Sequence, residues 1–147
     1  MAKEYQIRFI EATDPLFEQA ADLRYGVLFE PHGVSRNLDL DDRALGVLHV
    51  VALDMGKVVG YGRVERRGIH AQIAHLCVDP AVQGGGIGSQ ILQTILDRLR
   101  KEGTRDVFLN ARFTAMGLYR RFGFVEVGGV FDAENFPFPH KRMELKL

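Results

Sequence analysis

Alternating apolar and polar positions predict several strands along this chain. Residues 5–10 alternate in this way, and the apolar runs 48–53 and 58–64 flank the short turn Asp54-Met55-Gly56-Lys57. A period of two places successive side chains on opposite faces of a sheet, and two such runs around a glycine turn are typical of a β-hairpin. We expect further strands at residues 73–78, 106–109, 124–127 and 141–145.

A helical spacing of apolar residues predicts helices between these strands. Such spacing runs through residues 16–27 after Asp14-Pro15, where the aspartate caps a helix and the proline fits its first turn. A clearer amphipathic pattern covers residues 91–99 and is followed by Gly103, a residue type that often stands just past a helix end. Residues 115–122 predict a further short helix.

The periodic pattern fails between Phe29 and Gly46, which we interpret as a long loop or short helices. Irregular segments of this length in compact domains often bind ligands. The 147 residues fit one domain, residues 1–147, with a substantial core and with no repeat or linker. The order of elements predicts a mixed α/β fold of about six or seven strands and about three or four helices.

Composition argues against several classes of protein. The chain has 19 lysine and arginine residues and 19 aspartate and glutamate residues, so it lacks the excess of basic residues that is typical of a nucleic-acid-binding protein. No apolar run approaches the roughly 18 residues of a membrane span, and residues 1–5 show no signal-peptide pattern. One cysteine, Cys77, excludes an internal disulfide, so we expect a reducing cytoplasm. The five histidines lack metal-ligand spacing, and we predict no metal site.

The glycine-rich stretch Gln83-Gly84-Gly85-Gly86-Ile87-Gly88-Ser89 lies between the apolar run 73–80 and the amphipathic helix. Glycines let the backbone approach a ligand, and unpaired N–H groups at a helix start favour anions, so a phosphate-bearing ligand is expected. A P-loop would need a lysine at position 89, and a dinucleotide fingerprint would need a glycine there, so a nucleotide is a weaker interpretation. A tight turn without a ligand is the structural alternative.

Two blocks of sequence resemble one family. Gln83-x-x-Gly86-x-Gly88 resembles the acyl-CoA-binding motif Q/R-x-x-G-x-G/A of the GCN5-related N-acetyltransferase (GNAT) superfamily. Residues 110–124, which include Asn110, Tyr119 and Gly123-Phe124, resemble the family segment N-x-x-A-x-x-x-Y-x-x-x-G-F. The two blocks stand in the family's order and at a family-like separation. The resemblance extends from about Tyr5 to Leu147 and is strongest over residues 73–124.

The resemblance implies the GNAT fold, a central mixed and mostly antiparallel sheet of six to seven strands flanked by helices. It implies that acetyl-CoA is the cosubstrate and that an acetyl group passes directly to the primary amine of a small molecule. A non-catalytic acyl-CoA-binding or regulatory module on the same fold is the alternative. No nucleic-acid or membrane partner is expected, and a homodimer is the assembly that we consider.

The resemblance also assigns roles to particular residues. The backbone of Gln83, Gly84, Gly85, Gly86, Ile87, Gly88 and Ser89 would hold the pyrophosphate, although many relatives carry a basic residue where Gly85 stands. Leu76, Cys77 and Val78 would offer backbone groups to pantetheine and the thioester, and Asn110 would bond the pantetheine arm. Tyr119 would protonate the leaving thiolate. Arg120 or Arg121 would add charge near the nucleotide, unless both are simply solvated.

The base that deprotonates the amine is not evident from the sequence. Histone-type relatives place a glutamate on the strand before the glycine loop, but residues 70–75 contain no carboxylate. The candidates are Glu65, His75, His32 and His140, and a Pro-His pair that some family members share favours His140. Each of these residues alone is more often structural.

Two further hypotheses concern reactive and charged groups. Cys77 as an acyl-carrying nucleophile is a weaker interpretation than Cys77 as a small buried hydrophobe. Asp39, Asp41 and Asp42 lie in the irregular segment that covers the acceptor site in families of this kind. Their carboxylates would favour polyamine-like or amino-acid-like amines over neutral ones, unless the acidic loop is only solvated.

Overall fold

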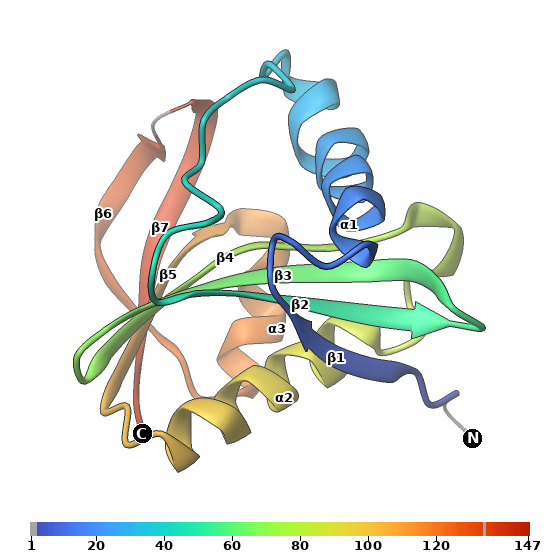
Figure 1. The fold of residues 1–147 in the computed structure, drawn as a ribbon. Coiled ribbons are helices and arrows are strands. Elements are labelled where there is room, and N and C mark those ends of the chain that lie inside the picture. Colours follow the sequence, from blue (N-terminus) through green and yellow to red (C-terminus); the bar gives the residue numbers. More distant parts are fainter. Residues whose placement is uncertain (1–2, 134) are drawn as a thin grey trace.

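The computed structural model describes residues 3–133 and 135–147, and Figure 1 shows how their helices and strands are arranged. One seven-stranded sheet has the order β1-β2-β3-β4-β5-β7-β6. Neighbouring strands are antiparallel except β4 and β5, which are parallel. The strands are β1 (Gln6–Ile10), β2 (Val47–Asp54), β3 (Lys57–Arg67), β4 (His70–Val78), β5 (Asp106–Arg112), β6 (Val125–Ala133) and β7 (Phe136–Lys146). The mixed, mostly antiparallel sheet that we predicted is confirmed.

Helices cover both faces of this sheet (Figure 1). They are α1 (Leu16–Arg24), α2 (Ile87–Lys101) and α3 (Met116–Arg121), together with the short helical turns η1 (Tyr25–Phe29), η2 (Glu30–His32), η3 (Pro80–Val82) and η4 (Phe113–Ala115). The segment between His32 and Val47 contains neither helix nor strand, as the missing periodicity predicted. No helix in the described part of the chain is long and apolar enough to cross a membrane.

The ends of the helices follow from local sequence. The Asp14 carboxylate accepts a hydrogen bond from the Leu16 backbone N–H at 2.9 Å, which satisfies an unpaired donor at the start of α1. Gly103 follows α2 with a φ of 84°, and the Thr104 N–H reaches back to the Leu99 carbonyl at 3.0 Å. This is a Schellman motif, which needs a left-handed residue and therefore favours glycine.

The hydrophobic core has two parts, one on each face of the sheet. The first packs six buried residues of α2, Ile87, Ile91, Leu92, Ile95, Leu96 and Leu99, against one face. The second lies beneath α1 and η1 and contains Ala20, Phe29, Tyr61 and Cys77. Gly60 lets α2 approach the sheet closely, because a Cβ there would lie 2.7 Å from Cγ2 of Ile87.

The two C-terminal strands are much longer than the apolar runs 124–127 and 141–145 predicted. β6 and β7 continue toward each other as far as Ala133 and Phe136 and form the outer hairpin of the sheet. Glycines and prolines interrupt the alternation there, so the sequence gives little sign of strand. Pairing with β5 and between the two strands imposes the extended conformation, and this hairpin supplies one wall of the cavity described next.

Candidate active site

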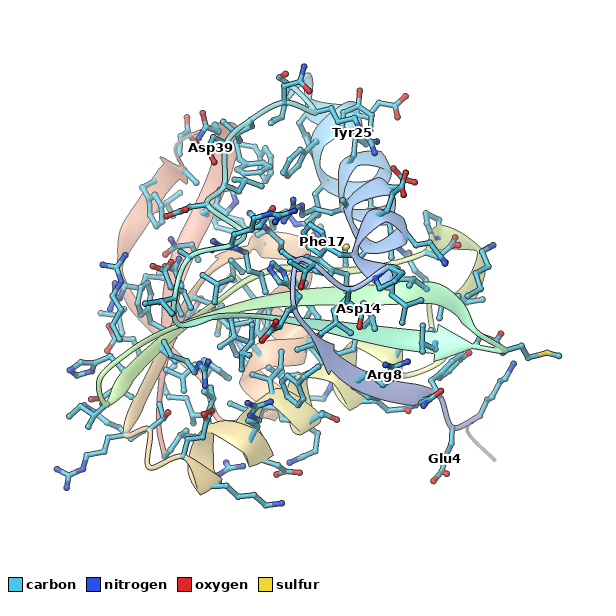
Figure 2. The ribbon with its side chains drawn as sticks, viewed as in Figure 1. Glu4, Arg8, Asp14, Phe17, Tyr25 and Asp39 are labelled. Carbon is cyan, nitrogen blue, oxygen red and sulfur yellow. The ribbon has the colours of Figure 1, made fainter. Side chains whose placement is uncertain are left out.

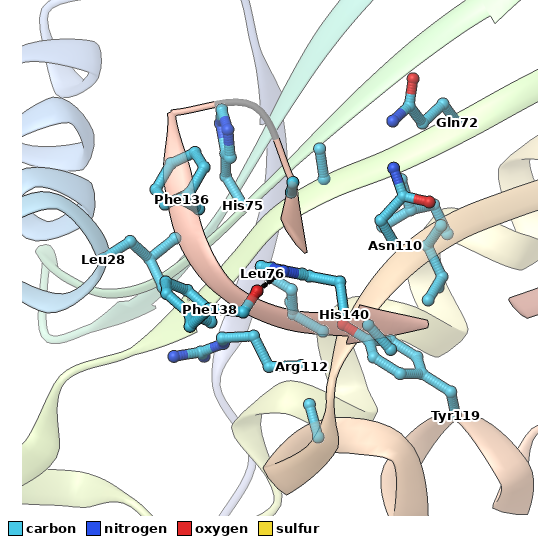
Figure 3. A pocket seen from close by; sticks show the side chains of 16 residues that line it. Leu28, Gln72, His75, Leu76, Asn110, Arg112, Tyr119, Phe136, Phe138 and His140 are labelled. Carbon is cyan, nitrogen blue, oxygen red and sulfur yellow. Dashed lines mark hydrogen bonds between the residues drawn. The ribbon is translucent and has the colours of Figure 1, made fainter. Parts of the chain in front are cut away.

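The parallel strands β4 and β5 part soon after they begin. Only His70–Gln72 pair with Asp106–Phe108, although both strands continue for several more residues. Beyond Gln72 the edge of β4 that faces β5 has no strand partner in the described chain. The divergence opens a cavity of about 270 Å³ in the middle of the sheet, which Figure 3 shows from close by.

A β-bulge shapes β4 at the level of this cavity. Tyr61 pairs with Cys77 and Arg63 pairs with Ala74, so His75 and Leu76 both lie opposite Gly62. His75 has a φ of 56°, which is unusual for a residue other than glycine. Bulges redirect side chains and end regular pairing, and this one turns His75 and Leu76 toward the cavity that they line.

The cavity gathers residues that are far apart in the sequence. Four of the predicted site residues, Leu76, Asn110, Tyr119 and His140, line it together (Figure 3). The other residues that line it are Leu28, Gln72, Ile73, Ala74, His75, Leu109, Ala111, Arg112, Ala115, Ala133, Phe136 and Phe138.

Tyr119 comes from α3 and is buried against Phe124, with the ring centroids 5.8 Å apart. Burial raises the pKa of its phenol to about 12, and the nearby Arg112 guanidinium opposes this rise. A phenol with such a high pKa remains protonated at neutral pH. It can therefore donate a hydrogen bond to a developing thiolate, but it gives up its proton reluctantly.

His140 lies inside β7, whereas the strand that we predicted at residues 141–145 would begin just after it. Its side chain is buried, and Nδ1 is 2.7 Å from the carbonyl oxygen of Phe138. A carbonyl can only accept, so Nδ1 carries the hydrogen and Nε2 keeps its lone pair. Burial lowers the pKa of His140 below its usual 6.5, and the Phe138 hydrogen bond opposes the shift. The ring is therefore neutral at pH 7, with an available basic nitrogen.

The other candidate bases are less suited to the role. His75 lines the cavity, but burial and the positive charge of Arg24 lower its pKa to about 3, so it is a very weak base. Glu65 forms ion pairs with Arg63 and Arg67 and does not line the cavity. His32 is exposed and packs on the ring of Phe138, with centroids 4.4 Å apart, outside the lining residues.

Cys77 is buried in the core beneath α1 and does not line the cavity. Burial raises the pKa of its thiol to about 12, so almost no thiolate forms at neutral pH. These observations agree with a packing role for the side chain. Val78 also lies outside the cavity lining, and the backbone roles suggested for Cys77 and Val78 stay predictions.

The glycine-rich stretch lies beyond the C-terminal end of β4, between η3 and α2. Gly84 and Gly86 have φ values of 85° and 82°, which only glycine adopts easily. Gly86 is the N-cap of α2, and no side chain of the described residues caps that end, so the first N–H groups of the helix are available to an anion. Residues 83–86 are exposed and do not line the cavity, but β4 connects the two places.

Arg112 is the residue that our sequence analysis missed. It is the last residue of β5, lines the cavity, and pairs across the sheet with His140. The family segment N-x-x-A-x-x-x-Y, counted back from Tyr119, places its alanine at Ala115 and its asparagine at Arg112. Asn110 is therefore two residues out of register with the motif, although it does line the cavity. This spacing is the signal in the sequence that points to Arg112.

The irregular segment is held by a buried polar cluster, which we define as Arg24, Asp42, His49, Tyr61 and Arg63. The Arg24 guanidinium donates two hydrogen bonds to the Asp42 carboxylate, at 3.1 and 2.8 Å, and Arg63 adds a third at 3.3 Å. His49 contacts the Tyr61 hydroxyl at 2.6 Å and the Asp42 carbonyl at 2.9 Å. Two arginines hold the pKa of Asp42 below its usual value despite its burial.

Asp42 is thus occupied by protein partners and is not free to meet a ligand. Asp39, labelled in Figure 2, and Asp41 lie on the same segment and are exposed. Neither of them lines the cavity. Among the residues that the structure describes, no group of three or more histidine, cysteine or acidic side chains is placed to hold a metal ion.

A sheet divided by two parting parallel strands, with a glycine-rich helix start beyond one of them, is the architecture of acyl-CoA-dependent acyltransferases. A family model described as an acetyltransferase (GNAT) domain matches residues 32–147. The chain belongs to this family, and the resemblance seen in the sequence is confirmed. Acetyl-CoA is the cosubstrate of this family.

The chain is similar to N-alpha-acetyltransferase RimI of Mycobacterium tuberculosis, with 38% identity over 54% of this chain and 53% of that protein. Among solved structures, Escherichia coli ElaA has a TM-score of 0.81 and 21% identity, and the match covers 96% of this chain and 99% of that one. An aminoglycoside 6'-N-acetyltransferase complexed with coenzyme A has a TM-score of 0.78 and 17% identity, with 96% of both chains covered. The chain spans between 17% and 55% of the length of five curated relatives that it matches.

Proposed function

We propose that this protein acts as one domain that transfers an acetyl group from acetyl-CoA directly to the primary amine of a small molecule. The observation that carries the proposal is the meeting of Tyr119 and His140 in one cavity between the parted strands β4 and β5. An acid and a base of suitable protonation state face the same space, and β4 leads from that space to the exposed glycine-rich helix start.

Each step of the reaction has a candidate group. Backbone N–H groups of residues 83–89 would bind the pyrophosphate at the start of α2, where the helix dipole favours negative charge. The unpaired edge of β4 around Leu76 would offer N–H and carbonyl groups to the pantetheine and the thioester. Asn110, whose side chain has no hydrogen bond within the described chain, would bond the pantetheine arm.

In the transfer itself, the amine nitrogen attacks the thioester carbon, an N–C bond forms and the C–S bond breaks. Nε2 of His140 would take a proton from the amine, either directly or through one water. The Tyr119 hydroxyl would donate a hydrogen bond to the departing sulfur. The departing thiolate takes up one proton, and His140 returns the proton that it took from the amine, so the products are the acetylated amine and coenzyme A as a thiol. No covalent enzyme intermediate is needed, in agreement with the buried, protonated Cys77.

The first experiment measures thermal stability with acetyl-CoA and with ATP. Acetyl-CoA at concentrations well above its dissociation constant should raise the melting temperature, because a ligand that binds the native state stabilises it by mass action, whereas ATP should not. Gly86→Asp should abolish the shift by placing a negative charge at the phosphate site. Gly56→Asp is the matched control, since both glycines have nearly equal φ values, 82° and 83°, and open surroundings.

Release of free coenzyme A with a panel of amines then tests catalysis. Release that depends on an amine supports the proposal. A thermal shift without release from any amine would favour the non-catalytic acyl-CoA-binding module. Absence of the shift in the unmodified protein, with millimolar acetyl-CoA present, contradicts both.

A further inference from the structure

The chemistry of the cavity walls points to the kind of amine that enters. Arg112 is the one charged side chain that lines the cavity in the described part of the chain, apart from the titratable histidines. Its guanidinium forms no ion pair and no hydrogen bond among the described residues, whereas most other arginines of the sheet have acidic partners. A guanidinium that no protein group satisfies is well suited to bind a carboxylate, which matches its forked donors.

The position of Arg112 places this charge beside the proposed base. Arg112 and His140 are directly opposite residues of the antiparallel pair β5 and β7. The side chains of such residues start on the same face of the sheet, with Cβ atoms roughly 4.5–5.5 Å apart. An amine near Nε2 of His140 and a carboxylate near Arg112 are therefore at a separation that a single small molecule can span.

The strand that carries His140 also supplies aromatic groups to the cavity. Phe136 and Phe138 line it from β7, and their ring centroids are 6.2 Å apart in an edge-to-face arrangement. Phe138 also stacks on His140, with centroids 4.6 Å apart, and Leu28 reaches the same space from η1. Aromatic rings and leucine favour an apolar or aromatic group on the ligand.

We infer that the acceptor is an amino acid with an apolar or aromatic side chain, whose carboxylate is held by Arg112 while its amine lies beside His140. This inference rests on the proposed function, which it narrows. Of the two amine classes expected from the acidic loop, it retains the amino-acid-like class and rejects the polyamines. Asp42, the acidic residue of the loop that is least exposed, is already paired with two arginines and is not free to attract an amine.

The experiment compares two acceptors with two forms of the protein. L-phenylalanine and L-phenylalaninamide differ only at the carboxylate, and the unmodified protein and Arg112→Gln differ only at its proposed partner. For L-phenylalanine, Arg112→Gln should lower kcat/KM about 10- to 100-fold, the usual effect of losing a charge-assisted hydrogen bond. For the amide the loss should stay within about twofold, and KM for acetyl-CoA should not change.

Arg142→Gln is the matched control, because Arg142 stands on β7 two residues from His140 but is paired with Glu144 and lies outside the cavity lining. It should leave both acceptors unaffected. Equal losses with both acceptors would overturn the inference, since Arg112 would then act on the transfer itself. A change confined to KM for acetyl-CoA would overturn it too, as would a preference of the unmodified protein for the amide or for spermidine.

A binding measurement separates this inference from the proposed function. N-acetyl-L-phenylalanine carries the carboxylate and the aromatic group but needs no turnover, and calorimetry can follow its binding to both forms in the presence of coenzyme A. Binding that depends on Arg112, without acetylation of any amine, would leave the site assignment intact and contradict the proposed function. If N-acetyl-L-phenylalanine does not bind the unmodified protein, the inference fails even if another amine is acetylated.

Discussion

The buried polar cluster and the cavity both place polar groups inside the protein, but they differ in how those groups are satisfied. In the cluster, the Asp42 carboxylate accepts hydrogen bonds from Arg24 and Arg63, and His49 has a partner for each ring nitrogen. In the cavity, Tyr119 and Arg112 have side-chain polar groups without hydrogen bonds among the described residues, and Nε2 of His140 is likewise available.

This difference distinguishes polar groups that stabilise the fold from polar groups that remain available to a ligand. Buried polar groups are costly unless they are paired. Most polar groups of the cluster are paired, with Nε of Arg24 as an exception among the described residues, and these bonds hold an otherwise irregular segment in place. The cavity leaves its groups for a ligand to satisfy, and its stability must come from the strands and helices around it. Both regions contain histidine and arginine near the sheet, so residue type alone does not distinguish them. Changes in the cavity should therefore affect turnover, and changes in the cluster should affect folding.

The largest effect is expected from Tyr119→Phe. The change removes only the hydroxyl that donates to the leaving sulfur, and the loss of such a group typically lowers turnover by ~10²–10⁴-fold. The melting temperature and the stabilisation by acetyl-CoA should change little, because the ring and its packing on Phe124 are retained. Steady-state kinetics with the best amine provide the measurement. An unchanged kcat would show that Tyr119 belongs with the structural polar groups.

Asp42→Asn should have the next largest effect, and on stability. Removing one partner of a buried ion pair costs about 3 kcal/mol, because Arg24 is left with an uncompensated charge in a site where its side chain is only 7% exposed. Unfolding in urea gives the change in free energy. Asp41→Asn is the control and should stay within about 0.5 kcal/mol, since Asp41 is exposed. If Asp42→Asn and Asp41→Asn lowered the free energy of unfolding equally, the polar cluster would have no special role in stability.

A pH dependence of turnover tests the role of His140. Burial lowers its pKa below 6.5, so the neutral, basic form predominates above that pH and is lost as the pH falls through the lowered pKa. The acid limb of kcat/KM should therefore have its midpoint below pH 6.5. His140→Gln should remove this limb and lower kcat/KM at neutral pH by ~10²-fold or more. A limb that persists unchanged in His140→Gln would assign it to another group.

His49 provides the corresponding test in the polar cluster, with a smaller effect. Burial lowers its pKa below 6.5, so the unfolded state binds more protons than the native state in acid. Its contribution to stability is present above about pH 6.5 and is lost as the pH falls below that value. Urea unfolding at several pH values should show this loss, and His49→Gln should reduce it. Turnover of the folded protein should not follow the same curve.

The smallest effect is expected from the exposed acids of the loop. Asp39→Asn combined with Asp41→Asn should change KM for the best amine by less than about twofold at low salt, because neither residue lines the cavity. This measurement tests the hypothesis that the acidic segment attracts cationic amines. A larger rise in KM that disappears at high salt would support that hypothesis and show that the loop takes part in acceptor binding.

Periodicity and turn chemistry in the sequence determined most of the fold. The β2–β3 hairpin forms around Met55 and Gly56, both with positive φ, and α2 ends at Lys101, two residues before the left-handed Gly103. Both features follow from backbone preferences of residues close together in the chain. The family motif likewise singled out Tyr119, which lines the cavity, and the glycine-rich stretch that precedes α2, and the functional roles of both stay predictions. These features depend on neighbours close in sequence, so they could be predicted. The outer hairpin could not, because its extended conformation depends on pairing between β5, β6 and β7.

Only the tertiary structure decided which polar residues are free. Arg112 and His140 are 28 positions apart in the chain and become neighbours through the β5–β7 register. Asp42 and Asp41 are adjacent in sequence, yet one is bound by two arginines and the other is exposed. The physical reason is that pairing, burial and pKa depend on distances between residues from different elements, and a single sequence does not specify those distances.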